Sequence, residues 1–307
     1  MKKIIKNIEN KLHEPGIVSK LVSELSNSEL NSLYLELFRA QCEHLTPADV
    51  LRQFEQNRFT HPAKIDEIAY KELELEWLKH AHKAGFQPIQ LSPLAPLGSC
   101  SVVGEVHQNN IVSATRGSEV VSDATNVLAL QIASEFKADP TKRDIHHCTT
   151  FRHTRAQHFT NPAFSAHFGA FCMVTGGFDR GNHAFELDQL DKHVRFYIDR
   201  LEQDLSVELL LKLYWKSDNT VFQSNLRERW DELSSQIKII DDAKDDTDDY
   251  YQTVRIKIFA VYNNQEIDLA DLGFVNWSQR LLNNRKHRML ISGAGLELVH
   301  NIKMGKI

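Results

Sequence analysis

The sequence contains few cysteines, and no two of them lie close together. Cys42, Cys100, Cys148 and Cys172 are widely spaced along 307 residues and form no CxxC pair. Neither a disulfide framework nor a cysteine-rich zinc site is therefore predicted. The sequence also lacks the run of about 20 apolar residues that a membrane-spanning helix needs. Its N-terminus, MKKIIKNIENKLHEPG, has no long apolar stretch followed by a cleavage site. We expect a cytoplasmic protein with no membrane contact.

The sequence also has no excess of positively charged residues. The formal net charge is −5, which argues against a broad surface for the phosphate backbone of a nucleic acid, so any such contact would be local. Hydrophobic residues make up 42% and charged residues 25% of the chain, as in ordinary globular proteins. The length suits either one large domain with an appendage or two domains.

Helical periodicity predicts a small N-terminal part and a large remainder. Residues 1–60 are expected to be helices broken at prolines, forming an appendage to a core of residues 61–307. Apolar positions recur with helical spacing from Asp66 to Lys83, just ahead of a glycine that ends the helix. Further helices are predicted at 124–136, after the capping pair Ser122-Asp123, and over about 186–235, as a helix at 186–205 and a second helical stretch at 206–235.

Extended segments predict an antiparallel sheet. Residues 145–155 and 167–176 suit a hairpin with a long connection, and 253–270 suit a second hairpin that turns at Asn263-Asn264. Shorter extended segments are expected at 86–94 and 111–115, a solvated acidic loop at 241–249, and a strand running through glycines into a helix at 291–300. Hairpins interleaved with helices indicate an α+β fold: an antiparallel sheet flanked by helices, with an N-terminal helical appendage, rather than a doubly wound parallel sheet.

The segment FRHTRAQHFTNPAFSAHFGAF, residues 151–171, concentrates basic and aromatic side chains. A metal site is not favoured, because the nearby histidines and Cys148 have neither the i, i+4 helical spacing of a zinc protease nor a CxxC partner. A nucleic-acid surface is not favoured, because the net charge of the chain is negative. The segment is best interpreted as the wall of a pocket for a nucleotide or an amino-acid-like molecule.

Three stretches, in this order, resemble the motifs of the class II aminoacyl-tRNA synthetase catalytic core. AHKAGFQPIQLSPL resembles the first motif, a helix ending in Gly-aromatic and a strand with a proline at the dimer interface. FRHTR…HFGAF resembles the second motif, and ISGAGLELVH resembles the third. The matching residues are Gly85, Phe86, Pro93, Arg152, His167, Phe171 and Glu297. The resemblance implies a homodimer formed through residues 66–94.

Two shorter likenesses point to the histidyl-like subgroup. TRGSE, residues 115–119, resembles the loop that holds the amino group of the substrate, and DDYYQTVRIKIF, residues 249–259, resembles the Tyr-Tyr strand of the histidyl-tRNA synthetase core. The resemblance implies ATP and Mg²⁺ as cofactors. It assigns substrate binding to Glu119, Arg116, Tyr250 and Tyr251, nucleotide binding to Arg152, Arg155, His167, Phe171 and Glu297, and the catalytic role to Arg152.

Each of these residues has a structural alternative. Phe171 would equally suit an ordinary hydrophobic core, and Arg152 a structural ion pair. Glu119 would suit a cap or bridge near the 124–136 helix. A buried charged side chain needs a partner in any protein, so pairing of Arg152 or Glu119 does not by itself indicate a binding role.

The sequence departs from the family pattern at two positions. Thr154 stands where the second motif has a carboxylate, and Leu298 stands where the third motif has an arginine. Only nine residues follow Leu298, too few for an anticodon-binding domain, so usual tRNA charging is not expected. Two functions compete: a ligase that activates or transfers a small carboxylate or amino acid, and a catalytically inactive paralogue that senses a metabolite or regulates a partner protein.

Overall fold

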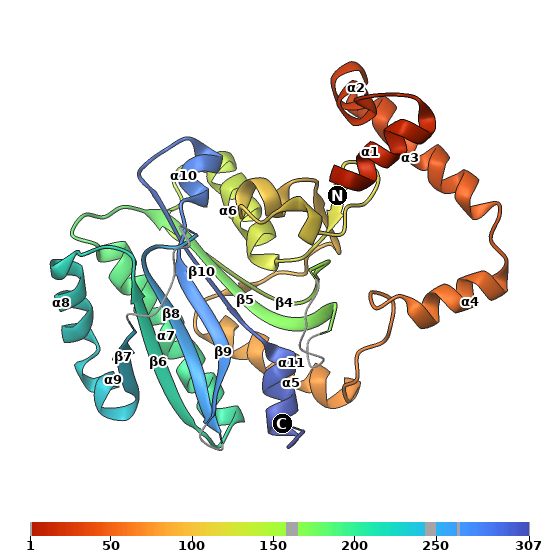
Figure 1. The fold of residues 1–307 in the computed structure, drawn as a ribbon. Helices are drawn as coiled ribbons and strands as arrows, with labels where there is room; N and C mark the ends of the chain where they lie inside the picture. The colour runs from red at the N-terminus through yellow and green to blue at the C-terminus, as the bar shows by residue number, and fades with distance from the viewer. Residues whose placement is uncertain (1, 158–164, 243–249, 263–264, 307) are drawn as a thin grey trace.

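The computed structural model describes residues 2–157, 165–242, 250–262 and 265–306. Its centre is a sheet with the strand order β1-β4-β5-β10-β9-β8-β6-β7 (Figure 1). Neighbouring strands are antiparallel except at the two edges, where β1 is parallel to β4 and β6 is parallel to β7. The strands are β1 (Gln87–Pro88), β4 (Ile145–Thr154), β5 (His167–Phe178), β6 (Glu208–Trp215), β7 (Lys238–Asp241), β8 (Gln252–Tyr262), β9 (Gln265–Phe274) and β10 (His287–Ala294).

Helices surround this sheet, and a small second sheet pairs β2 (Leu94–Pro96) with β3 (Ser118–Val120). A π-helical turn, Ser99–Val103, and a 3-10 turn, Gln108–Asn110, lie between β2 and β3. No helix in the described ranges is long and apolar enough to cross a membrane. The helices are α1 (Lys2–Leu12), α2 (Ile17–Glu24), α3 (Asn27–Cys42), α4 (Pro47–Gln56), α5 (Glu67–Lys83), α6 (Ala124–Ala138), α7 (Ala184–Asp204), α8 (Thr220–Arg229), α9 (Asp231–Gln236), α10 (Trp277–Leu282) and α11 (Leu296–Lys303).

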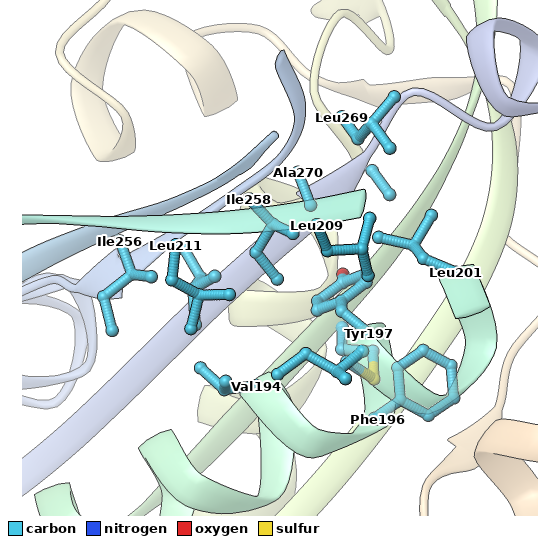
Figure 2. Close-up of a cluster of buried hydrophobic side chains, with 14 of the residues drawn as sticks. Val194, Phe196, Tyr197, Leu201, Leu209, Leu211, Ile256, Ile258, Leu269 and Ala270 are labelled. Carbon is cyan, nitrogen blue, oxygen red and sulfur yellow. The ribbon is translucent and has the colours of Figure 1, made fainter. Parts of the chain in front are cut away.

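One face of the sheet is covered by α5, α7 and α11. The apolar stripe predicted for the 186–205 helix packs here, because Leu190, Val194, Tyr197 and Leu201 of α7 are fully buried. Figure 2 shows this stripe against inward side chains of β6, β8 and β9. α5 joins the same core and ends at the predicted glycine: Gly85 has φ 87°, a left-handed conformation that a glycine adopts without strain.

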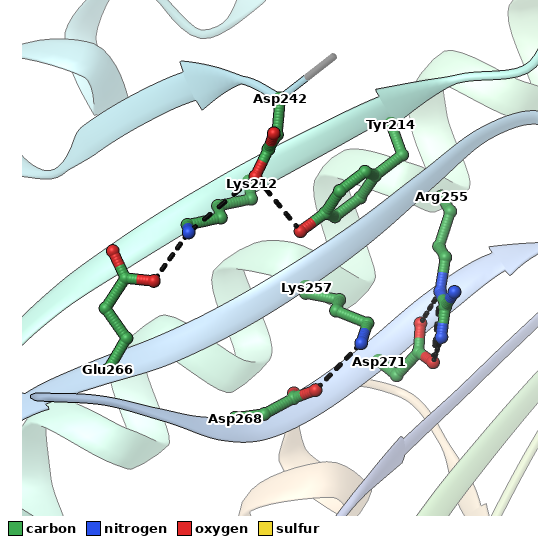
Figure 3. A network of polar contacts seen from close by, with 8 residues as sticks. All are labelled: Lys212, Tyr214, Asp242, Arg255, Lys257, Glu266, Asp268 and Asp271. Atoms are coloured by element: carbon green, nitrogen blue, oxygen red, sulfur yellow. Dashed lines mark hydrogen bonds and ion pairs between the residues drawn. The ribbon is translucent and has the colours of Figure 1, made fainter. Parts of the chain in front are cut away.

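The other face is covered over only half its width. There α6 and α10 pack on β4, β5 and β10. Beyond them, β6, β8 and β9 carry cross-strand ion pairs, with Lys212 Nζ 2.5 Å from Glu266 Oε2 and Lys257 Nζ 2.9 Å from Asp268 Oδ2 (Figure 3). The apolar half and the polar half of this face therefore meet along a boundary, and a cavity can form there.

The N-terminal helices contribute nothing to either core. None of α1 to α4 has a buried residue, and Figure 1 shows these helices reaching away from the sheet. Contacts to the rest of the chain include Asn31 Oδ1, which accepts the Gly117 N–H at 3.1 Å, and Arg58 Nη2, which donates to the carbonyl of Ala156 at 2.8 Å. The predicted division of the chain near residue 60 stays a prediction.

Most predicted elements are present, and the α+β class is confirmed. Helices α5, α6 and α7, the β4–β5 and β8–β9 strand pairs and the β10–α11 connection all form where expected. The acidic run 241–249 and the turn at Asn263-Asn264 lie largely or wholly outside the described residues.

Two predictions of local structure are wrong. The stretch 206–235 is not helical throughout, since Glu208–Trp215 form β6 before α8 and α9 begin. Its run LLLKLY forms a strand that pairs with β8 and β7, and a mostly buried strand shows nearly the same apolar run as a buried helix. Residues 111–115 form no strand; Ser113 makes an isolated bridge to Glu119, and the strand begins at Ser118.

Candidate ligand-binding site

Two adjoining hollows lie beside α6, at the boundary between the apolar and polar halves of the sheet. Their volumes are about 250 Å³ and 290 Å³. Both are lined by Asp123, Arg155, Tyr250, Tyr251 and Asp271, so we treat them as one central cavity. The glycine-rich end of β10, Gly293–Gly295, lines it too. Glycines here keep the wall free of side chains.

Arg155 is the cationic wall of the central cavity. Its guanidinium carbon lies 5.1 Å from the centroid of the Phe168 ring, a cation–π arrangement, and its Nε donates to the carbonyl of Ser122 at 3.3 Å. Among the described residues, no carboxylate forms an ion pair with Arg155. A planar cation fixed in this way can accept a carboxylate or phosphate of a ligand.

Behind Arg155, the wall of the cavity contains His153 and Cys172. The Nε2 atom of His153 accepts the Ala124 N–H at 3.0 Å and lies 3.9 Å from Cys172 Sγ. Burial lowers the pKa of His153 to about 4 and raises the pKa of Cys172 well above its usual value. Both side chains are therefore neutral at pH 7 in the protein alone.

The opposite wall is formed by two tyrosines and an ion pair. The ring centroid of Tyr250 lies 5.8 Å from that of Trp277, and Tyr251 lies against Gly273, where a Cβ would come within 2.4 Å of its ring. Arg255 and Asp271 form a close pair, with Nη2 and Oδ2 2.6 Å apart (Figure 3). Burial raises the pKa of Asp271, against the effect of Arg255. Tyr250 and Tyr251 thus line the central cavity, and their part in substrate binding stays a prediction.

Arg152 and its partners lie on the other face of the sheet. Arg152 Nη2 lies 3.0 Å from Glu297 Oε2, which also accepts the Gly169 N–H at 2.9 Å. Arg152 Nη1 lies 3.0 Å from His167 Nδ1, while the other ring nitrogen of His167 donates to the His61 carbonyl at 2.6 Å. This network joins β4, β5, α11 and the segment before α5. Arg152, His167 and Glu297 are therefore not brought to the central cavity.

Phe171 is a core residue. It is fully buried, stacks on Phe196 with ring centroids 5.3 Å apart and meets the edge of Trp77. The aromatic ring of this strand that lines the central cavity is Phe168. Neighbouring side chains of a strand point to opposite faces, so a motif matched one position out of register has its side chains on the wrong face.

The same alternation decides which side chains near the end of β4 reach the central cavity. His153 and Arg155, two residues apart, point to the cavity, whereas Arg152 points away. Cys172 and Ser292 line it as well and carried no signal in the sequence. Both faces of β4 and β5 are buried, so hydrophobic alternation could not have fixed which face each residue takes.

Glu119 is held by its own loop. The side chain is 2% exposed, and its carboxylate accepts hydrogen bonds from Gly98 N, Cys100 N and Gln108 Nε2 at 2.9, 2.9 and 3.1 Å. Arg116, at φ 63°, forms the turn before Gly117. Neither residue lines the central cavity. Glu119 and Arg152 therefore belong to different networks and do not line one cavity together.

Solved structures of aminoacyl-tRNA synthetases have the same fold. Apo histidyl-tRNA synthetase of S. aureus aligns with a TM-score of 0.60 at 11% identity, over 81% of this chain and 70% of that one. An ATP phosphoribosyltransferase regulatory subunit/histidyl-tRNA synthetase from Bacillus halodurans aligns at 0.58 and 12%, over 79% and 82%. Pyrrolysyl-tRNA synthetase from Desulfitobacterium hafniense aligns at 0.51 and 13%, over 83% and 74%. No protein-family model and no curated protein sequence matches the chain.

The chain has the catalytic-core fold of class II aminoacyl-tRNA synthetases. The large, mostly antiparallel sheet flanked by helices is the architecture expected from the three motifs. A histidyl-tRNA synthetase, a regulatory subunit and a threonyl-tRNA synthetase align with similar TM-scores, 0.60, 0.58 and 0.59, so the predicted class II fold is confirmed and the likeness to the histidyl-like branch stays a prediction.

Proposed function

We propose that the central cavity binds a small amino-acid-like molecule and that the protein acts as a metabolite-sensing or regulatory paralogue of the synthetases. The observation that carries the proposal is the placement of Arg155: a cation supported by Phe168 and lacking a carboxylate partner among the described residues. Asp123 lines the same cavity. Opposite charges that line one cavity suit the carboxylate and ammonium groups of a zwitterion.

ATP-dependent activation is the second candidate, and the cavity supports it less. Where the resemblance implies an arginine followed two residues later by a carboxylate, the cavity side carries His153 and Arg155. The guanidinium of Arg155 covers a face of Phe168 on which a base would otherwise stack. Leu298 packs against the apolar core and gives no phosphate contact. If ATP and Mg²⁺ bind, Arg155 would have to leave Phe168 to hold a phosphate.

The test is a melting-temperature screen with amino acids and nucleotides, since a molecule that binds the native state raises its stability by mass action. We expect a shift with an amino acid or a related carboxylate. ATP with magnesium, measured by calorimetric titration, is expected to bind weakly, and amino-acid-dependent pyrophosphate exchange to be absent. Micromolar ATP affinity together with exchange for any amino acid would overturn the regulatory proposal in favour of the ligase.

We also propose a homodimer, formed through α5 and the strand that follows it. A groove of about 470 Å³ is lined there by five apolar or aromatic residues, Tyr70, Leu75, Leu78, Pro93 and Phe151, and by six polar or charged ones, Glu67, Lys71, Glu74, Gln90, Thr150 and Arg152. Leu75 is 51% exposed. Apolar side chains around an open groove are expected at a protein interface. The regulatory role implies a protein partner in addition.

A cytoplasmic location is proposed on the state of the thiols. Cys42, Cys100, Cys148 and Cys172 are all free. Proteins that keep several unpaired cysteines are typical of reducing compartments.

A further inference from the structure

Three potential metal ligands meet in the wall of the central cavity. Asp123 precedes the first turn of α6, His153 lies on β4 and Cys172 on β5. One ligand atom from each lies within 4.8 Å of the other two. His153 is 3% and Cys172 2% exposed, so the group is built into the wall and is not a chance cluster on the surface. The residues are 30 and 19 positions apart in sequence, which is why no spacing motif marks them.

We propose that Asp123, His153 and Cys172 bind one zinc ion, with the fourth coordination position open to the central cavity. Thiolate, imidazole and carboxylate are the three ligand types that zinc takes in proteins, and sites with three protein ligands leave a position for water or a ligand molecule. The cavity is lined by the same three side chains, so such a molecule has access to the metal. Softness of the thiolate favours zinc over magnesium or calcium.

The hydrogen bonds around Asp123 leave it free to coordinate. Both the N–H and the hydroxyl of Thr125 donate to Asp123 Oδ1, at 2.9 and 2.7 Å. The helix cap therefore uses one carboxylate oxygen, and Oδ2 remains for a metal. A hydrogen-bonded carboxylate of this kind is the usual support for a metal ligand.

His153 must exchange one partner. Its Nε2 accepts the Ala124 N–H in the metal-free protein, and its Nδ1 is buried without a partner among the described residues. Coordination through Nε2 replaces a single neutral hydrogen bond by a metal–imidazole bond. The Ala124 N–H stands at the first helical position of α6, where no intrahelical acceptor exists, so zinc binding must shift the start of α6 away from His153.

Cys172 is the ligand that becomes negatively charged when zinc binds. The thiol lies 3.9 Å from His153 Nε2 and is neutral in the metal-free protein. Zinc binding transfers its proton to solvent, and the Zn–S bond forms with the thiolate. One proton is therefore released for each zinc bound, while His153 binds in its neutral form and Asp123 as a carboxylate.

The inference does not rest on the proposed amino-acid ligand, because the metal is tested alone. The full chain is treated with a chelator, dialysed, and titrated with Zn²⁺ and separately with Co²⁺. We expect one metal per chain, one proton released near pH 7, and a thiolate-to-cobalt charge-transfer band in the near ultraviolet. Absence of that band in the folded wild-type protein overturns the proposal, whatever the cavity binds otherwise.

Variants assign the ligands. Cys172→Ala is expected to abolish the cobalt band and to weaken zinc binding by at least about 10- to 100-fold. Cys148→Ala is the matched control, since Cys148 is equally buried but lies in the core on the other face of the sheet. Asp123→Asn keeps an oxygen for Thr125 while removing the charge, and should weaken zinc binding with the fold intact. Zinc affinity in Cys172→Ala equal to that of Cys148→Ala would exclude the site.

Discussion

The guanidinium of Arg155 lies over the ring of Phe168, 5.1 Å from its centroid, while the neighbouring arginine on β4, Arg152, pairs with Glu297 behind the sheet. Two arginines three residues apart thus serve different purposes. Arg155 presents its charge to a cavity, and Arg152 ties α11 to the strands. The first prediction separates them.

Arg155→Ala should weaken the binding of whichever amino acid or nucleotide gives the largest melting-temperature shift by about 10- to 100-fold, because a hydrogen bond to a charged group contributes roughly 1.5–3 kcal/mol. Calorimetric titration measures the change. Arg152→Ala is the control and should leave this affinity within about 2-fold of wild type while reducing stability by about 1 kcal/mol. The reverse order of effects would place the ligand on the Arg152 side.

Asp204 is predicted to be a major contributor to stability. Its carboxylate has no exposed surface and accepts hydrogen bonds from Trp77 of α5, Arg200 of α7 and Lys303 of α11, at 2.6 to 2.8 Å. Asp204→Ala leaves these donors unpaired and should cost about 3–5 kcal/mol in urea unfolding. Asp231→Ala, at the exposed start of α9, is the control and should change stability by less than about 0.5 kcal/mol.

Stability should fall as the pH drops below about 6.5. Burial lowers the pKa of His146 to about 4 and holds the pKa of His193 well below its usual value. Both histidines contact one hydroxyl, since Thr175 Oγ1 lies 3.0 Å from His146 Nδ1 and 2.8 Å from His193 Nε2. As the pH falls below about 6.5, these two histidines bind protons in the unfolded chain but stay neutral in the folded chain. The stabilisation is therefore complete above pH 6.5 and is lost toward pH 4.

For His146 the loss amounts to about 3 kcal/mol, from the pKa difference at 1.36 kcal/mol per unit. Urea unfolding at a series of pH values should show it, and His146→Gln should flatten the profile by close to one proton. A variant profile parallel to that of wild type would mean that folding does not change the pKa of His146.

The dimer should depend on the groove along α5. Leu75→Glu replaces an exposed apolar side chain of the groove by a charged one, and sedimentation at micromolar concentration should change from dimer toward the 35.3 kDa monomer. Val221→Glu is the matched control, since Val221 is 64% exposed on α8, away from the groove. A wild-type protein that sediments as a monomer would refute the interface itself.

Removal of residues 1–56 should change the unfolding free energy of the core by less than about 1 kcal/mol, because α1 to α4 bury no side chain. Deletion through residue 65 should cost more. It also removes Arg58, which holds the Ala156 carbonyl, and the His61 carbonyl, which holds His167. Equal losses from both deletions would show that α1 to α4 are integral to the core.

The order of the helices and strands could be predicted from the sequence. The face of the sheet to which each site residue points could not. Caps and glycines mark α5 and α6 clearly, because Asp66 and Asp123 accept first-turn N–H groups as expected of their positions. The β4–β5 pair is different. Ala170 and Phe171 are both buried, so neither polarity nor periodicity says which of them faces the cavity.

The packing of segments that are far apart in the sequence was the second feature that the sequence could not predict. β6 reads as part of a helix because its leucines are contiguous, and only its position between β8 and β7 makes it a strand. Likewise, the meeting of Asp123, His153 and Cys172 depends on a helix start and two strands that come together in three dimensions. Local patterns carry no information about such convergence.

The place of β10 in the sheet has a consequence for synthesis of the chain. Residues 287–294 insert between β5 and β9, and so close the middle of the sheet last. Until they leave the ribosome, β5 and β9 present unpaired backbone edges, which pair readily with other chains. A chaperone that shields β-strand edges would therefore act on this protein in the interval between the emergence of β5 and the pairing of residues 287–294.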